Sequence, residues 1–245
     1  EKTETKFVAC GVHPDYQDRP GAAVRGRAIV PAPFDARVLK SDFEFLRPPI
    51  PEFMIFGGMM VGKMDIPRLL ARFRTPRNFL YAAGLFLRYL FDRLRFSRGT
   101  RLVMGNALVG RMFYSLKKLG VRPSFNTTLL DLIYEGGRVV GANLSISGKP
   151  SRVDTRRGVV LATGGFAHNS KFREWLMPDP VPRFSLAVET NRGEGLEAAE
   201  KLGARISDTE NGSGGFWTPV SVTKRKDGSQ GLFPHLSLDR AKPGV

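Results

Sequence analysis

Residues 159–165 combine an apolar run with a glycine pair, which suits a place where the backbone itself contacts a ligand. The run 159–162 is unbroken, which is typical of a strand buried on both faces of a parallel sheet. The residues that close it are small or carry a hydroxyl: Ala162, Thr163, Gly164 and Gly165. In open α/β sheets ligands bind beyond the carboxyl ends of strands, and glycine there leaves backbone N–H groups free to donate to an acceptor such as a pyrophosphate oxygen. A tight strand-to-helix turn, which also requires glycine, is the alternative explanation.

The segments on either side of this run predict the elements that would position it. Ahead of it, residues 123–155 show strand patterning, with a two-residue hairpin signal at Gly136-Gly137. We expect a small antiparallel meander there, inserted just before the parallel strand. Behind it, helices are predicted over 169–176 and from about Gly193 to Gly203.

The amino-terminal half of the sequence indicates irregular chain followed by helices. Residues 11–53 are so rich in proline and glycine that long helices are excluded, and we expect an extended segment. Apolar residues recur at helical spacing over 66–97, and Thr75-Pro76 predicts a break with Thr75 as an N-cap. A further helix is predicted from about Asn106. The fold class is therefore mixed α/β, and a single parallel strand without partners suggests that the 245 residues hold only part of a larger fold.

The composition is that of an ordinary globular chain. Hydrophobic residues make up 42% of it, and no stretch is apolar enough over its length to span a membrane. The single Cys10 excludes an internal disulfide and the charged start differs from a secretory signal, so we expect the reducing cytoplasm as the compartment. No metal site is predicted, because no metal-ligand spacing links the three histidines, His13, His168 and His235.

The net charge of +15 is unusual, and much of it comes from one segment. Between Arg68 and Arg101 there are nine arginines and one acidic residue, Asp92. A basic field of this size attracts phosphates or anionic lipid. Nucleic acid is disfavoured as a partner, because no zinc-finger spacing, recognition helix or repeated aromatic-plus-basic pattern accompanies the arginines. The favoured interpretation is a solvated or partner-facing helical surface; peripheral docking on an anionic membrane is a further hypothesis.

The glycine-ended run belongs to a wider set of motifs. These are GVVLATGGFAHN at 158–169, the preceding NTTLLDLI and GRVVGA, TNRGEG at 190–195, RGTRLVMGNALVGR and FPHLSLDRAKPGV. Together they resemble the flavoprotein family of the fumarate reductases and 3-ketosteroid dehydrogenases. In that family the strand ending in ATGGF passes under bound FAD and leads into a capping catalytic domain. The resemblance implies part of a glutathione-reductase-like FAD-binding domain over 1–165, with the meander inserted in it, and part of a substrate domain over 166–245.

The resemblance implies cofactor-binding roles for six residues. Leu129 stands at the place in the strand start Thr127-Thr128-Leu129 where the family's backbone meets the adenine. Glu194 replaces an aspartate that binds near the flavin ribityl chain and the pyrophosphate. The remaining four would lie against the FAD: Ala162, Thr163, Gly164 and Gly165.

Three further residues are candidates for substrate binding and catalysis. Asn106 is explained fully as an N-cap, but the resemblance also places its loop near the active site as a substrate contact. Trp217 lies in the loop where fumarate reductases hold a substrate-binding histidine, and the aromatic pair here favours a flat apolar substrate. Arg240 matches an arginine of the fumarate reductase proton-delivery path and is the predicted catalytic residue.

The resemblance implies an FAD-dependent dehydrogenase or reductase that moves a hydride between the flavin and a carbon next to a carbonyl. We expect a small apolar substrate that contains a carbonyl, of the 3-ketosteroid type. The family's Gly-x-Gly-x-x-Gly strand-to-helix element and its carboxyl-terminal flavin-binding segment are not found in the sequence. The chain is therefore expected to be the middle of a flavoenzyme, inactive without the missing amino- and carboxyl-terminal flavin-binding segments. The rival hypothesis is a non-catalytic basic module that binds anionic membrane or nucleic acid.

Overall fold

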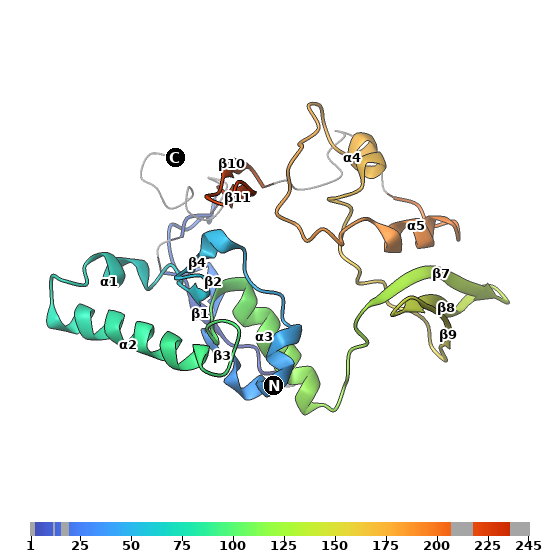
Figure 1. Ribbon diagram of the computed structural model, residues 1–245. Coiled ribbons are helices and arrows are strands. Elements are labelled where there is room, and N and C mark those ends of the chain that lie inside the picture. Colours follow the sequence, from blue (N-terminus) through green and yellow to red (C-terminus); the bar gives the residue numbers. More distant parts are fainter. Residues whose placement is uncertain (1–2, 12, 16–19, 207–217, 236–245) are drawn as a thin grey trace. The chain divides into compact units, whose positions relative to one another are not determined.

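The computed structural model describes residues 3–11, 13–15, 20–206 and 218–235 (Figure 1). The described residues form two compact units. Unit 1 is built on Glu1–Arg122 and also holds Lys224–Gly231, and unit 2 is built on Pro123–Thr223. The predicted domain boundary at residue 165 stays a prediction, since it concerns the complete flavoenzyme.

Unit 1 combines helices with short two-stranded antiparallel ladders. Its helices are the 3-10 helices η1 (Ala36–Phe45) and η2 (Pro51–Phe53) and the α-helices α1 (Ile66–Leu70), α2 (Pro76–Arg93) and α3 (Met104–Lys118). Its ladders are β1 (Phe7–Ala9) with β2 (Ile29–Pro31), β3 (Phe34–Asp35) with β6 (Arg101–Leu102), and β4 (Met54–Ile55) with β5 (Met59–Met60). A separate two-stranded ladder joins β10 (Val220–Lys224) and β11 (Gln230–Pro234), whose residues are divided between the two units. No α-helix occurs over the described part of 11–53, but the expectation of an extended segment is wrong over η1, which is a kinked 3-10 helix that supplies Leu39 and Phe43 to the core.

The hydrophobic core of unit 1 lies where η1, the β3–β6 ladder and α3 meet. Leu39, Phe43 and Leu102 are completely or almost completely buried there. Gly110 lets α3 approach β3 closely, because a Cβ at this position would lie 2.9 Å from the Phe34 ring. This approach stabilises unit 1 through dense apolar packing rather than through an extended sheet.

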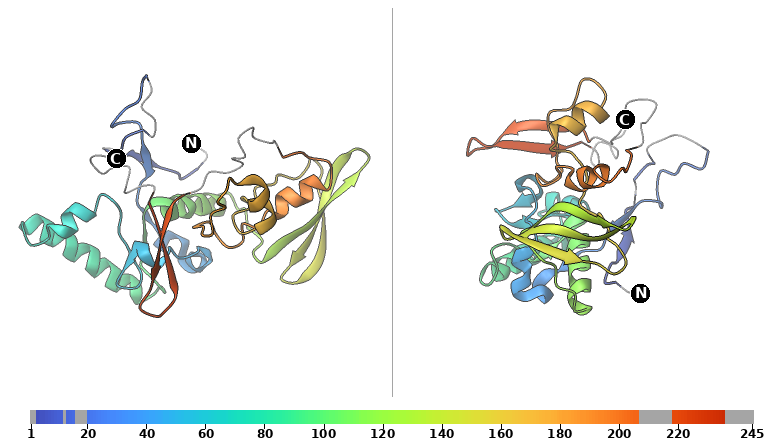
Figure 2. Two further views of the ribbon diagram at one scale, coloured as in Figure 1. Left: turned by 90° about the horizontal axis from the view of Figure 1, so that it is seen from above. Right: turned by 90° about the vertical axis from the view of Figure 1, so that its right-hand side faces the viewer.

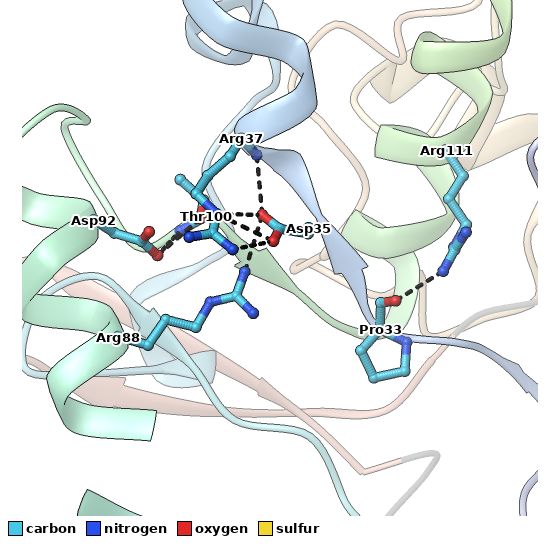
Figure 3. Close-up of polar contacts among 7 residues, drawn as sticks. All are labelled: Pro33, Asp35, Arg37, Arg88, Asp92, Thr100 and Arg111. Atoms are coloured by element: carbon cyan, nitrogen blue, oxygen red, sulfur yellow. Dashed lines mark hydrogen bonds and ion pairs between the residues drawn. The ribbon is translucent and has the colours of Figure 1, made fainter. Parts of the chain in front are cut away.

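Two carboxylates hold α2 against the ladders of unit 1 (Figure 3). Asp35 lies 3.0 Å from Arg88 Nη2 and also accepts hydrogen bonds from Arg37. Burial raises the pKa of Asp35, but the hydrogen bonds from Arg37 and the charge of Arg88 outweigh it, so the pKa lies below its usual range. Asp92, at the end of α2, accepts from both the backbone N–H and the hydroxyl of Thr100 at 2.8 Å.

Two buried arginines satisfy carbonyl oxygens of the irregular chain. Arg111 donates to Pro33 O at 2.8 Å, as Figure 3 shows. Arg98 donates to Leu46 O at 2.6 Å and stacks over the Phe43 ring, and burial lowers its pKa. Arg98 is one of the nine clustered arginines, so part of the basic segment is structural and does not form a solvated surface.

A buried polar cluster anchors the α1–α2 hairpin. Asp65 is 3% exposed. Its carboxylate accepts from Tyr81 Oη at 2.5 Å, from the two terminal nitrogens of Arg101 at 2.9 and 3.0 Å, and from Gly62 N at 2.8 Å. Burial raises the pKa of Asp65, but these donors outweigh it and the pKa is lowered. The predicted break between the two helices is confirmed, since Thr75 Oγ1 caps α2 by accepting from a backbone N–H at 3.2 Å.

Unit 2 contains the predicted meander and two short helices. The strands are β7 (Thr127–Glu135), β8 (Arg138–Ile146) and β9 (Lys149–Asp154), paired antiparallel in the order β7–β8–β9. The hairpin prediction is confirmed, because Gly136 and Gly137 join β7 to β8 with φ of 57° and 80°. The helices are α4 (Ser170–Leu176) and α5 (Glu194–Glu200), both where the sequence predicts them. Figure 2 shows α5 beside the meander, where Lys201 Nζ lies 2.7 Å from Asp131 Oδ1.

The predicted parallel strand at 159–162 is wrong for this structure. Residues 158–165 form no ladder with any described strand, and Val160 is 90% exposed. A strand exists only where a neighbour completes its hydrogen bonds, and no described strand pairs with this segment. The apolar run is a surface segment here, although its composition is that of a buried one.

Candidate functional site

Two segments of unit 2 that the sequence analysis singled out lie against each other. Gly164 has a φ of 82°, and a Cβ on it would lie 2.5 Å from Asn191 Oδ1. A Cβ on Gly195 would lie 2.2 Å from Thr163 Oγ1. A Cβ at either position would displace the side chain of Asn191 or of Thr163, and at Gly164 the left-handed φ also favours glycine. The segments 162–165 and 190–195 are therefore in close contact.

Hydrogen bonds fasten the two segments on the side toward α4. The backbone N–H of His168 donates to Asn191 O at 2.9 Å. Asn169 Nδ2 donates to Arg192 O at 2.8 Å and to Glu197 Oε1 at 3.1 Å, while Asn169 Oδ1 caps α4 by accepting from a backbone N–H. One asparagine side chain therefore joins the start of α4 to both the loop and the helix that follow Thr190.

The two helices pack where their ends meet. Phe172 of α4 is completely buried. Gly193, which precedes α5, has a φ of 83°, and a Cβ on it would lie 2.9 Å from the Phe172 ring. The ring of Phe166 lies 5.8 Å from that of Phe172 and extends this contact. Aromatic packing thus fixes the loop that carries Glu194.

The outer side of the segment 162–165 is open. All four residues are exposed, and their backbone N–H groups donate to no described residue. A Cβ on Gly165 would have no described atom within 4 Å. The segment therefore contacts Asn191 and Gly195, and its backbone N–H groups have no acceptor among the described residues, which leaves them available to a ligand.

The other predicted cofactor residues of unit 2 take different positions. Glu194 is half-buried as the first residue of α5, directly beside Gly195 and its contact with Thr163. Leu129 is half-buried in β7 and pairs with Leu144 of β8. The structure thus brings Glu194 together with the glycine segment, whereas no contact joins Leu129 to it among the described residues.

The predicted substrate and catalytic residues lie elsewhere in the chain. Asn106 is in unit 1, within the first turn of α3, where Nδ2 donates to Arg47 O at 3.2 Å. The N-cap expectation for Asn106 is wrong, because α3 begins at Met104 and Val103 holds the cap position. Asn106 lines a small cavity of about 130 Å³. Trp217 and Arg240 lie outside the described residues.

Two asparagines that organise this site carry no functional signal in the sequence. Asn169 only begins a predicted helix, and Asn191 has no predicted role. An asparagine directly before a helix is a signal for a cap, but its second amide contact, to a segment more than 20 residues away, has no local signature. Asn191 could be found only by knowing which residue faces Gly164.

A family model described as FAD binding domain matches residues 22–245. The chain belongs to this FAD-binding family. The predicted family and its cofactor, FAD, are thereby confirmed.

Individual relatives agree with this assignment. The 4-oxocyclohex-2-ene-1-carboxylate 5-dehydrogenase of Sinomonas cyclohexanicum is 36% identical over 96% of the chain and 40% of its own length. The 3-oxosteroid 1-dehydrogenase of Mycolicibacterium smegmatis is 33% identical over 84% of the chain and 36% of its own length. The crystal structure of 3-ketosteroid delta1-dehydrogenase from Sterolibacterium denitrificans, in complex with 1,4-androstadiene-3,17-dione, matches with a TM-score of 0.75 and 28% identity over 93% of the chain and 41% of that protein. The chain thus spans about two fifths of the length of these relatives, and nothing in the comparisons supports the non-catalytic alternative.

The geometry of the glycine segment is compatible with bound FAD. A pyrophosphate or a flavin edge needs donors without side chains in front of them, and the unpaired N–H groups of 162–165 provide these. The open space at Gly165 leaves room for such a group. The same segment, with Glu194 beside it, is therefore the part of the described chain best suited to contact the cofactor.

Proposed function

We propose that the chain is part of an FAD-dependent dehydrogenase or reductase that acts on a carbon–carbon bond next to a carbonyl. The observation that carries the proposal is the segment 162–165, which is braced by the Asn191 loop on one side and open on the other. Membership of the FAD-binding family and the names of the relatives, which are dehydrogenases of cyclic oxo compounds, support the class of reaction.

Each cofactor residue has a distinct proposed task. Ala162, Thr163, Gly164 and Gly165 would hold the FAD through backbone N–H groups, with their small side chains allowing a close approach. Glu194 would accept a hydrogen bond from the ribityl region, and Leu129 would contact the adenine through its backbone. FAD, when bound, supplies hydride transfer to or from the substrate carbon. The protein's task is then to orient the cofactor and the substrate and to exclude water.

The proposed substrate is a small, flat, apolar molecule with a carbonyl, of the 3-ketosteroid type. The solved relative is in complex with a steroid dione, and the two curated relatives are named for cyclic oxo compounds. Asn106 and Trp217 are the proposed substrate contacts. Arg240 is the proposed catalytic residue, as a member of the path that delivers the proton paired with the hydride.

Activity is proposed to require a Gly-x-Gly-x-x-Gly strand-to-helix element and a second flavin-binding segment. Neither is found in the 245 residues. The first of these elements holds a dinucleotide diphosphate at a helix N-terminus in related folds. We therefore expect the 245 residues, expressed alone, to bind FAD at well below one per chain.

The proposed compartment is the cytoplasm, with contact to a membrane surface. The free Cys10 is consistent with a reducing compartment. Among the described residues, no helix is long and apolar enough to cross a bilayer. An apolar ketone partitions into lipid, so an enzyme for such a substrate gains by lying at the membrane surface.

The proposed reaction can be tested on the complete gene product under anaerobic conditions. A saturated 3-ketosteroid should bleach the flavin absorbance, because the substrate passes a hydride to the oxidised flavin. The corresponding 3-hydroxysteroid, which lacks the activating carbonyl, is the matched control and should leave the spectrum unchanged. Purified protein that carries no flavin, or that is bleached equally by both compounds, would contradict the proposal.

A further inference from the structure

Helix α2 presents a wide apolar face to solvent. Leu80, Leu87, Phe91 and Leu94 recur at helical spacing and are 68%, 52%, 69% and 78% exposed. The opposite side of the helix contacts the rest of unit 1 through the buried Tyr89 and Asp92 and the half-buried Tyr81. The exposed face, which we call the α2 stripe, consists of these four residues together with Phe79 and Leu90.

The turn between α1 and α2 continues the stripe and adds positive charge. Leu70 and Phe73 are both 78% exposed, and Figure 1 shows this turn at the end of the hairpin away from the core of unit 1. Four exposed arginines surround them: Arg68, Arg72, Arg74 and Arg77. No acidic residue occurs between Asp65 and Asp92 in the sequence. Within the described part of the chain, no ion pair joins any of these four guanidinium groups to a carboxylate.

The turn is held in shape by hydrogen bonds. Arg72 Nη1 donates to Leu69 O at 3.1 Å, and its guanidinium lies 4.6 Å from the centre of the Phe73 ring. Asn78 Nδ2 donates to Ala71 O at 3.2 Å. The apolar side chains are therefore presented by an ordered turn, with a guanidinium group next to an exposed aromatic ring.

We propose that the α2 stripe and the arginines of the turn dock the protein on an anionic phospholipid bilayer, with α2 lying in the plane of the interface. This inference identifies the surface for the membrane contact proposed above and rests on that contact, but it is independent of the reaction. The combination is the one that interfacial helices use, with leucine and phenylalanine in the acyl boundary and arginine at the level of the headgroups. Lipid phosphates supply the counter-charge that the described chain does not provide.

Charge favours the bilayer over the other occupants of this face. Two copies of the hairpin in a symmetric contact would place their acid-free arginine turns on the same interface, which like-charge repulsion opposes. A covering segment of the same protein would have to neutralise the arginines as well as bury the stripe. A bilayer with anionic headgroups accommodates both features without a specific partner surface.

Sedimentation with vesicles tests the proposal on the complete gene product. Binding should occur with vesicles of phosphatidylcholine and phosphatidylglycerol, be reduced by salt, and be weak with phosphatidylcholine alone. Reversing three charges in the turn (R72E, R74E and R77E) should weaken partition by about 100-fold. Replacing three stripe residues (L80S, L87S and F91S) should weaken it at least about tenfold.

A second triple reversal provides the matched control. Arg138, Arg156 and Arg157 are exposed in unit 2, outside the hairpin. The variant R138E, R156E and R157E changes the net charge by the same amount, but it should keep most of the vesicle binding because these arginines lie outside the α2 stripe and the turn. An equal loss in this control would overturn the proposal in favour of general electrostatic attraction.

Other outcomes would assign the face to another occupant. A dimer that the stripe variants convert to monomers would show a second copy there, and absence of vesicle binding with a stable monomer would show that the protein covers its own stripe. Duplex DNA that binds through the turn arginines when vesicles do not would indicate nucleic acid. Bound flavin is measured in every sample, so a failure of docking is distinguishable from a failure of the proposed enzyme.

Discussion

The Asp65 cluster in unit 1 and the glycine segment in unit 2 differ in the burial of their polar groups and in whether those groups have hydrogen-bond partners. In unit 1 the carboxylate of Asp65 accepts from Tyr81, Arg101 and Gly62, and it is almost completely buried. In unit 2 the backbone donors of 162–165 are exposed and unpaired among the described residues. The carboxylate of Asp65 is satisfied by described residues, whereas the N–H groups of 162–165 have no acceptor among the described residues and are open to a ligand.

This difference separates residues that stabilise the chain from residues that serve a ligand. A buried, satisfied cluster loses stability when one member is removed, because its partners remain buried without a counterpart. Blocking the open side of the donor segment, as at Gly165, should lower ligand affinity and leave the fold unaffected, whereas a change on the side that contacts Asn191 should lower stability. Each prediction below tests one side of this distinction.

The largest effect is expected for D65N. The amide would leave the half-buried Arg101 without a counter-charge and would direct an N–H group at a donor. We expect the free energy of unfolding to fall by about 3 kcal/mol. Denaturant unfolding with an unchanged slope would measure the loss.

D131N is the matched control for this prediction. It removes an ion pair with Lys201 whose two side chains are 53% and 64% exposed. Because exposed pairs contribute little, the unfolding midpoint should hardly move. Equal losses of stability in D65N and D131N would show that burial does not make the Asp65 cluster more important for stability than the exposed Asp131–Lys201 pair.

A smaller effect is expected for G164A. The Cβ of the alanine would lie 2.5 Å from Asn191 Oδ1. The alanine must also adopt a φ of 82°. Together these should cost about 2 kcal/mol. Gly148 has the same φ of 82° but no described atom within 4 Å of its Cβ position, so G148A isolates the backbone cost.

The contact with Asn191 can be removed separately. The double variant G164A/N191A should lose no more stability than G148A, because the atoms that the new methyl group meets are gone. A double variant as unstable as G164A alone would mean that the two segments are not in contact as described.

The sequence predicted local structure well in both units. The helix break at Thr75, the hairpin at Gly136-Gly137 and the two short helices of unit 2 are all confirmed. Each depends on a signal within a few residues, such as a cap or a positive φ. The FAD-binding family was also predictable, because the glycine motifs are contiguous in the sequence.

Features that depend on distant contacts were not predictable. The run at 159–162 has the composition of a buried strand, but a strand also needs a neighbour, which composition cannot report. Asn106 occupies the first turn of α3 because the helix begins two residues earlier than expected. The role of Asn191 follows from its position against Gly164, which only the folded chain shows.

The smallest expected effect is a change in acid sensitivity. The pKa of Asp65 is lowered because its donors outweigh burial, so this group stabilises the folded chain fully above the unfolded-state pKa of about 3.9. The contribution is lost as pH falls through and below that value. D65N should therefore show a flatter decline of stability below about pH 4 than the unaltered protein, and an equally steep decline would contradict this assignment.

The most direct test of the account is the flavin content of G165V. Gly165 has open space at its Cβ position and a φ outside the left-handed region, so valine should leave the thermal stability of the cofactor-free protein unchanged but project where FAD is expected to pass. G84V, at an exposed helical glycine that also has open space, is the matched control. We predict that G165V purified as the complete gene product loses most of its bound flavin while G84V retains it. Full flavin occupancy in G165V would contradict the proposal that this segment contacts the cofactor.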